Sequence, residues 1–262
     1  MEKTALISVV KSDRAIVRGL FTILIALFLV HFAIVIAHFQ FGKPLSMPTA
    51  LFDVDVETNI PTFFNVMLFI LGSICFYLVG RTEEKNKRGW NIMSLVFLFL
   101  AMDEGSKIHE KLMLTTLRLM NDGDLGLGQN GWLFYAWIIP YGIAALALVA
   151  GLLPWLLKLD RKLMIGLFVS GGVYVFGAIF LEAWSGKVAE SILLTAQPDS
   201  FYDWLPCSVY KADNCFTYAD IRYVLLYSAE EFAEMTGLIL CIGVLTKTLK
   251  DRNAKIQMGF GE

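Results

Sequence analysis

The sequence predicts an all-α polytopic membrane protein with six transmembrane helices, and composition is the first of three observations behind that prediction. The chain has 262 residues, of which 56% are hydrophobic and only 18% are charged, and its mean hydropathy is +0.61. Soluble domains carry about 25% charged residues. An ordinary soluble enzyme, a disordered chain and a basic nucleic-acid-binding protein are therefore excluded, and we expect the lipid bilayer as a partner and no nucleic acid.

The second observation is that six apolar stretches are long enough to cross the hydrocarbon core, which requires about 20 helical residues. They lie at about 19–41, 63–80, 90–115, 132–157, 163–184 and 223–245. The third stretch is apolar as far as Met102 and then becomes polar, but we expect its helix to continue. Since no linker divides the chain, we predict a single transmembrane domain over residues 1–262.

The third observation is the distribution of charge, because cytoplasmic flanks of membrane helices retain lysine and arginine. Most of the 22 lysines and arginines lie in four segments on one side of the six-helix arrangement, namely 3–18, 81–88, 158–162 and 247–255. Both termini are therefore predicted to be cytoplasmic. Most of the acidic residues fall on the outer side, and a field of that sign attracts cations.

The four cysteines separate by position. Cys75 and Cys241 fall within spans and are expected to be small core residues. Cys207 and Cys215 lie in a long predicted outer loop, 197–220, which this topology places in an oxidising compartment. A disulfide between these two residues is therefore predicted.

Ionisable side chains occur inside several predicted spans, where each needs a partner, a cavity or a function. On the third helix, Asp103 and Glu110 share a face with His109 at its edge, whereas Glu104 and Lys107 point elsewhere. The last helix carries a stripe at helical spacing, Tyr227, Glu230, Glu231 and Glu234. The remaining candidates are Glu182 on the fifth helix and His31 and His38 on the first. At a rise of about 1.5 Å per residue they all fall in the outer half of the bilayer, so we expect one periplasm-side cavity.

Three interpretations of this cavity are open. In the leading one, a divalent transition metal (Zn, Fe or Mn) is coordinated by Asp103, His109, Glu110, Glu182, Glu230 and Glu234, with His31 or His38 as a further ligand or support. In the second, the carboxylates share protons, and the protein is a proton- or cation-coupled transporter. In the third, the acids are neutralised in a packing network, as in a structural or accessory subunit of a larger membrane complex, by Lys107, Lys111, Lys187 and Arg222.

The metal interpretation would allow an enzymatic function. The metal would activate water or dioxygen against a small molecule in the lipid phase, with Glu231 or Tyr227 as acid or base. No H-E-x-x-H or E-x-x-H spacing is present, so this interpretation depends on position rather than on a signature.

The first outer loop has acids at alternating positions, Asp53, Asp55 and Glu57, like the first half of a calcium loop. The position that requires glycine is Thr58, and the closing acid is replaced by Phe64. We therefore do not expect a calcium site there.

Three islands of sequence resemble a set of bacterial multipass inner-membrane proteins without an established function. They are N-I-P-T-F-F at 59–64, A-M-D-E-G-S-K-I-H-E at 101–110 and A-E-E-F-A-E-M-T-G at 229–237. In that set a D-E…H-E segment and an E-E-x-x-E-M segment recur. The resemblance implies a multi-pass protein of the bacterial inner (plasma) membrane and implies no activity. As partners we leave open a second copy of the chain, in a homo-oligomer, and a larger membrane complex.

Overall fold

The computed structural model describes residues 4–8, 12–42, 46–56, 58–83, 87–126, 128–196, 220–252 and 255–259. Its α-helices are α1 (Asp13–Phe41), α2 (Ser46–Phe52), α3 (Ile60–Arg81), α4 (Lys87–Ser106), α5 (Ile108–Met120), α6 (Ile138–Leu156), α7 (Arg161–Val175), α8 (Glu182–Ala196) and α9 (Ile221–Asp251). A short 3-10 helix, η1 (Gly131–Leu133), precedes α6, and a π-helical segment, η2 (Phe176–Leu181), joins α7 to α8. Two strands, β1 (Thr4–Ser8) and β2 (Lys255–Gly259), complete the described elements.

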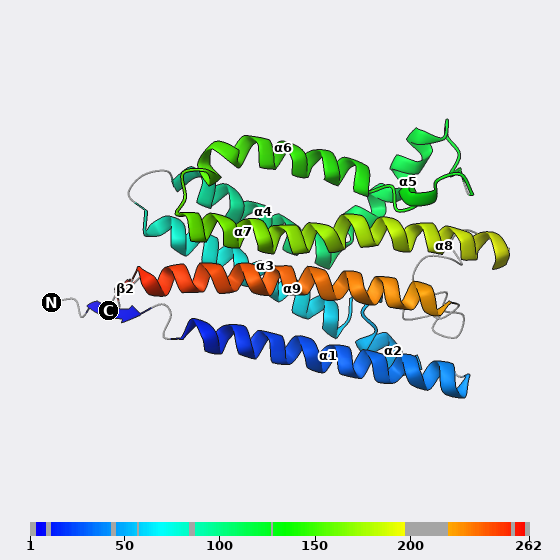
Figure 1. The fold of residues 1–262 in the computed structure, drawn as a ribbon, viewed down its shortest axis with the longest axis horizontal. Coiled ribbons are helices and arrows are strands. Elements are labelled where there is room, and N and C mark those ends of the chain that lie inside the picture. Colours follow the sequence, from blue (N-terminus) through cyan, green and yellow to red (C-terminus); the bar gives the residue numbers. More distant parts are fainter. Residues whose placement is uncertain are drawn as a thin grey trace.

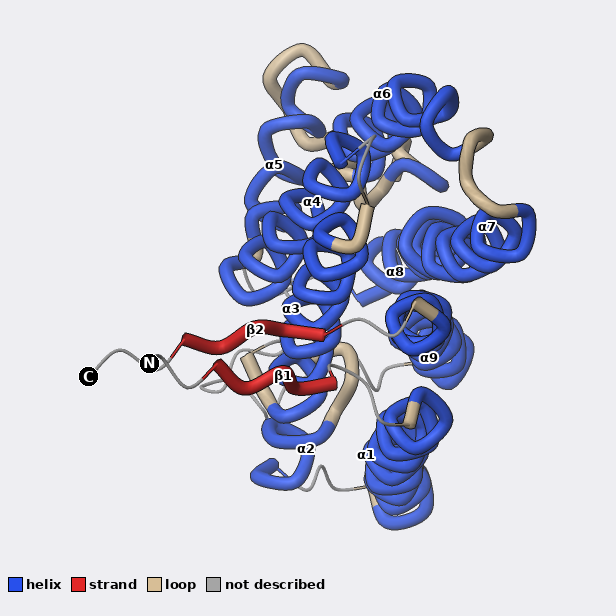
Figure 2. Tube along the Cα trace, turned by 90° about the vertical axis from the view of Figure 1, so that its left-hand side faces the viewer, coloured by secondary structure: helices blue, strands red, loops and turns tan. Residues whose placement is uncertain are grey.

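The long helices lie side by side along one axis, as Figure 1 shows. Helix α9 is central and packs against α1, α3, α7 and α8, and α3 also packs along α4. Helix α6 lies at the outside of the bundle (Figures 1 and 2). The chain thus forms one helical bundle with α9 as its axis.

Local signals explain where the main helices begin and end. The Ser12 hydroxyl accepts a hydrogen bond from the Ala15 amide at 3.3 Å, and Gly42 ends α1 in the left-handed conformation (φ 65°). The Asn59 side chain accepts from the Thr62 amide at 3.1 Å and so caps α3. Side-chain oxygens at a helix start and a glycine after its end satisfy backbone groups that the helix leaves unpaired.

Five helical stretches are long and apolar enough to cross a membrane: Asp13–Phe41, Ile60–Arg81, Ile138–Leu156, Arg161–Ile192 and Ile221–Asp251. They correspond to five of the six predicted spans. The predicted third span, 90–115, is not one helix, because α4 ends at Ser106 and α5 begins at Ile108. The predicted continuous helix there is therefore wrong, and Lys107 between the two adopts a left-handed conformation.

Apolar side chains cover both the inside and the outside of the bundle. The fully buried core gathers around α9 and α3 and includes Phe69, Phe76, Trp90, Leu238, Ile239 and Ile242. On the outer faces, Leu29 and Leu146 are 67% and 73% exposed. A soluble protein rarely exposes contiguous apolar surface of this kind, whereas a lipid-facing surface requires it. The chain is a multipass membrane protein.

The two terminal strands pair with each other in antiparallel register, from Thr4 opposite Gly259 to Ser8 opposite Lys255. This pair is an addition to the predicted all-α fold. It holds the chain before α1 and the chain after α9 at the same end of the bundle (Figure 1). The exact number of crossings and the orientation of the termini stay predictions.

The cysteines within the helices are buried free thiols, Cys75 on α3 and Cys241 on α9. Both positions agree with their prediction as core residues. The predicted disulfide between Cys207 and Cys215 lies outside the described residues.

Candidate functional site: an acidic cavity

A cavity of about 610 Å³ lies between α4, α5, α6, α9 and the continuous stretch from α7 to α8. Its acidic lining residues are Asp55, Asp103, Glu104, Glu110, Glu182, Glu230, Glu231 and Glu234. It also contains His109, Trp137 and five tyrosines, Tyr135, Tyr141, Tyr174, Tyr223 and Tyr227. Of the described residues that line it, none is lysine or arginine.

The break between α4 and α5 builds one wall of this cavity. Lys107 adopts φ 56° and ψ 43°, which turns the chain before α5 begins. The turn brings His109 back to Asp103, so that the His109 amide donates to Asp103 Oδ1 at 2.9 Å and the ring Nδ1 lies 3.2 Å from Oδ2. Residues six apart on an unbroken helix point to different faces. Asp103 and Glu110 therefore do not share one helix face as predicted, and Asp103 instead pairs with His109.

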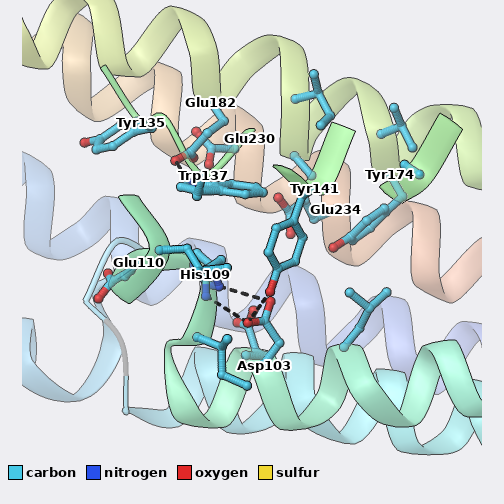
Figure 3. A pocket seen from close by; sticks show the side chains of 18 of the residues that line it. Asp103, His109, Glu110, Tyr135, Trp137, Tyr141, Tyr174, Glu182, Glu230 and Glu234 are labelled. Carbon is cyan, nitrogen blue, oxygen red and sulfur yellow. Dashed lines mark hydrogen bonds and ion pairs between the residues drawn. The ribbon is translucent and has the colours of Figure 1, made fainter. Parts of the chain in front are cut away.

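Helix α6 completes this pair from the other side. The Tyr141 hydroxyl donates to Asp103 Oδ1 at 2.8 Å, and the Asp103 side chain is almost fully buried. Figure 3 shows His109 between Asp103 and the ring of Trp137, with Tyr141 reaching the same carboxylate. The His109 and Trp137 ring centroids are 5.0 Å apart. The imidazole is thus fixed by the Asp103 carboxylate and by a T-shaped contact with the Trp137 ring.

Trp137 links the histidine to the carboxylates of α8 and α9. Its indole Nε1 donates to Glu182 Oε1 at 3.0 Å. Glu182 lies beside Glu230 (Figure 3), and Ser185 Oγ donates to Glu230 Oε2 at 3.1 Å. Side chains from α5, the segment before α6, α8 and α9 therefore form one connected polar wall.

Glycine allows α9 to approach the neighbouring helix at this point. A Cβ at Gly177 in η2 would lie 2.9 Å from the backbone oxygen of Glu230 and 3.0 Å from Glu234 Cγ. Since that approach is closer than ordinary Cβ contacts, no larger residue fits without displacement. Single π-helical turns such as η2 occur frequently at functional sites.

Glu104 is a cavity residue that sequence reasoning placed on another face. Asn65 on α3 is fully buried, and its Nδ2 donates to Glu104 Oε1 at 3.0 Å. An asparagine within an otherwise apolar predicted span was the signal that could have indicated a buried polar partner. The aromatic lining residues Tyr135, Trp137, Tyr141, Tyr174 and Tyr223 were also missed, because aromatic residues are common in membrane helices without any site.

Six of the eight predicted metal ligands line the cavity, but the two remaining histidines lie elsewhere. His31 is fully buried between α1 and α9, where Nε2 lies 2.9 Å from Ser228 Oγ and Nδ1 lies 3.6 Å from Asp53 Oδ1. His38, on the same helix, packs on Phe39 with ring centroids 5.4 Å apart. The predicted acid or base residues, Glu231 and Tyr227, do line the cavity.

The acidic loop before α3 has structural contacts. Asp53 Oδ1 accepts from the Asp55 amide at 3.0 Å, and its backbone oxygen accepts from Asn59 Nδ2 at 2.6 Å. Asp55 Oδ1 accepts from the Tyr223 hydroxyl at 3.2 Å and so joins the edge of the cavity. The third acid, Glu57, lies outside the described residues.

The lysines and arginine of the predicted neutralising network do not line the cavity. Lys111 donates to the Ser106 backbone oxygen at 2.8 Å, and Lys187 lies 5.3 Å from the centre of the Trp132 ring. Arg222 binds Asp220 at 2.6 Å, and Lys107 lies 3.8 Å from Glu110, where both side chains are partly exposed. Only the last of these contacts reaches an acid of the cavity.

Metal coordination has no ready geometry in the described part of the chain. No group of three or more His, Cys, Asp or Glu side chains there is placed so that it could hold a metal ion. The candidate ligands share one cavity without forming a coordination shell. The metal site therefore stays a prediction.

The helical bundle, the apolar outer surface and the acidic cavity define an integral membrane protein with a polar cavity inside its helices. A family model described as a domain of unknown function (DUF8692) matches residues 20–248, and the chain belongs to that family. No curated protein and no solved structure matches the chain. The match agrees with the predicted membership of a family without an established function.

Proposed function

We propose that the protein binds a cation in its acidic cavity, inside the membrane. The observation that carries this proposal is the composition of the cavity lining, in which eight acidic side chains and no described lysine or arginine surround about 610 Å³. Carboxylates arranged around a low-dielectric space produce a strongly negative potential that concentrates cations.

A bound cation would reduce the cost of burying these carboxylates in their ionised form. An ionised carboxylate withdrawn from water carries a penalty of several kcal/mol unless an opposite charge or a hydrogen bond compensates it. Glu230 is only 7% exposed and receives a hydrogen bond from Ser185, a neutral partner. A cation near Glu182, Glu230 and Glu234 would offset their mutual repulsion.

A divalent transition metal, Zn, Fe or Mn, is the first kind of cation to test. Glutamate side chains have three rotatable bonds, so rotation of Glu182, Glu230 and Glu234 could bring oxygens together around an ion. His109 would add the nitrogen ligand, with Asp103 orienting its ring as carboxylates orient metal-bound histidines. Glu231 and Tyr227 line the same cavity and would serve as acid or base toward a bound substrate.

The arrangement in the membrane follows from the same reasoning. We propose α4 as the sixth crossing, since the paired terminal strands require an even number of crossings. The lysine- and arginine-rich segments support a cytoplasmic position for both termini. The acidic cavity, at the end of the bundle away from the strands, would then open toward the periplasm.

The experiment is a measurement of cation binding to the full chain in lipid nanodiscs. Elemental analysis after purification without added metal, followed by titration with Zn²⁺ and Mn²⁺ and with tetramethylammonium, covers both metal and organic cations. We expect at least one of these cations to bind and to raise the thermal unfolding temperature, because a ligand of the native state stabilises it.

A double variant, Glu230→Gln with Glu234→Gln, should weaken that binding by about tenfold or more, a change of about 1.4 kcal/mol. The matched control is Asp251→Asn, which removes an exposed acid at the other end of α9. Absence of binding by every cation tested, or equal binding by the double variant, would contradict the proposed function.

A further inference from the structure

The size of the cavity indicates a ligand larger than a bare ion. Its volume of about 610 Å³ lies within the range of roughly 300–1,000 Å³ that is usual for sites that bind small organic molecules. A water molecule, by comparison, occupies about 30 Å³ in the liquid. A single ion would leave most of this space unfilled.

The lining has an apolar section beside the carboxylates, and Glu234, whose Cγ would lie 3.0 Å from a Cβ at Gly177, extends to the edge of that section. On α4, Val96, Phe99 and Leu100 precede Asp103, and on α6, Ala144, Ala145 and Leu148 follow Tyr141. The same order occurs before Glu182, where the lining residues are Val175, Ala178 and Ile179. In Figure 1 the first residues of α4 and α7 and the last residues of α6 lie at the end of the bundle where the terminal strands are, so these apolar runs lie on that side of Asp103, Tyr141 and Glu182. Seven helical steps separate Val96 from Asp103, so the first apolar lining residue of α4 lies about 10 Å along the helix axis from the carboxylate.

Aromatic rings lie next to the carboxylates of the cavity. Trp137 donates to Glu182, and the Tyr135 and Tyr223 hydroxyls are 2.9 Å apart, with Tyr223 also donating to Asp55. Aromatic faces beside carboxylates are typical of sites that bind alkylammonium groups, through cation–π attraction and charge. Metal ions are instead bound by groups of close ligand atoms, and the described residues contain no such group of three or more His, Cys, Asp or Glu.

The apolar section also reaches the outer surface of the bundle. Phe99 on α4 and Val175 on α7 line the cavity and are each 47% exposed. In a membrane that surface contacts lipid chains. A molecule with an apolar tail could therefore enter from the bilayer while its polar group reaches the acids.

We propose that the cavity binds an amphipathic organic cation, an amine or quaternary ammonium group attached to an apolar chain. The ammonium group lies among Glu182, Glu230, Glu234 and the aromatic rings, and the chain lies along Val96, Ala145 and Leu148. This inference rests on the proposed function, because it specifies the class of cation that the same cavity binds.

The test separates the contribution of the charged head from that of the chain. Binding of tetramethylammonium and of butyl-, pentyl- and hexyltrimethylammonium to the full protein in nanodiscs is measured by calorimetry, with empty nanodiscs as the baseline and 1-hexanol as the neutral control. We expect affinity to rise about two- to fourfold for each added methylene, since each buried methylene contributes up to about 0.8 kcal/mol. We expect no saturable binding of 1-hexanol.

Two kinds of variant should change this series differently. Glu230→Gln with Glu234→Gln should weaken the binding of every ammonium probe by about the same factor, and affinity should still rise with chain length. Ala145→Phe fills the apolar section. It should remove the dependence of affinity on chain length without weakening the binding of tetramethylammonium. Val96→Phe repeats this test from α4 in case the α6 variant does not fold.

The outcomes distinguish this inference from the proposed function. If the affinity of the ammonium probes is independent of chain length, the proposal of an amphipathic ligand is wrong. The same holds if Zn²⁺ or Mn²⁺ binds and no ammonium probe does. In both cases the proposal that the cavity binds a cation is not contradicted. If neither the metals nor the ammonium probes bind, both proposals are wrong.

Discussion

Lys107 is the residue that shapes one wall of the cavity. A side chain with a Cβ in the left-handed conformation costs about 1–2 kcal/mol relative to ordinary helix. In return, the turn allows the His109 amide and ring to contact Asp103, and hydrogen bonds to a charged group contribute about 1.5–3 kcal/mol. The hydrogen bonds between His109 and Asp103 therefore offset the unfavourable backbone conformation of Lys107.

Two substitutions at position 107 should separate the effect of this backbone conformation from that of the lost side chain. Lys107→Gly should be more stable than Lys107→Ala by about 1 kcal/mol, because glycine adopts positive φ without a steric penalty. Both variants remove the same partly exposed contact to Glu110, so each serves as the control for the other. Thermal or denaturant unfolding in detergent measures the difference. Equal stability of the two variants would show that α4 and α5 do not break at this residue.

The sequence predicted some of these residues better than others. Glu230 and Glu234 follow helical spacing on α9, and Glu182 lies in the outer part of an apolar stretch, so periodicity and depth were sufficient to bring them to one cavity. Glu104 was assigned to the wrong face because the predicted stripe ran from Asp103 through Ser106 to Glu110, whereas the cavity face of α4 contains Leu100, Asp103 and Glu104. A lysine gives no local signal for a left-handed residue, so the break between α4 and α5 could not be predicted from sequence.

At the scale of elements, the close packing of α7 and η2 against α9 positions the carboxylates. A Cβ at Gly237 on α9 would lie 2.6 Å from the backbone nitrogen of Tyr174 and 2.9 Å from the backbone oxygen of Ser170. Backbone atoms at that distance cannot move independently of the helix. Small residues that let helix backbones approach are a recurring feature of membrane helix packing.

Gly237→Ala should therefore destabilise the protein by about 1–3 kcal/mol, the usual cost of overpacking. The matched control is Gly171→Ala on α7, where an added Cβ meets nothing within 4 Å. That substitution should be neutral or should stabilise by up to about 1 kcal/mol through helix propensity. Unfolding temperatures of the two variants measure the contrast, and a Gly237→Ala protein as stable as the control would contradict this packing.

At the scale of the whole molecule, the bundle has an apolar exterior and an acidic cavity inside. Composition and the lengths of the apolar stretches were enough to predict a multipass helical protein. The pairing of β1 with β2 could not be predicted, because it joins segments at opposite ends of the chain. Most of the aromatic part of the cavity was missed for a similar reason, since Tyr135, Tyr141, Tyr174 and Tyr223 come from distant parts of the sequence and meet only in the folded bundle.

The position of helix α6 determines whether the bundle contains the cavity. Among its residues only Ile138 and Leu152 are buried, whereas Ile143 is 64% exposed. A helix that packed tightly on α4 and α7 would close the space that Tyr141 and Ala145 line. The cavity is thus a property of how all of these helices are arranged and not of one motif.

An experimental density map of the protein purified from its native membrane is the decisive measurement of whether this cavity holds a cation. We expect density for a non-protein group in contact with Glu230 and Glu234, with α6 held apart from α4. A map in which α6 closes onto α4 and α7, and in which these carboxylates bind only lysine, arginine or backbone amides, would contradict the binding of a cation there.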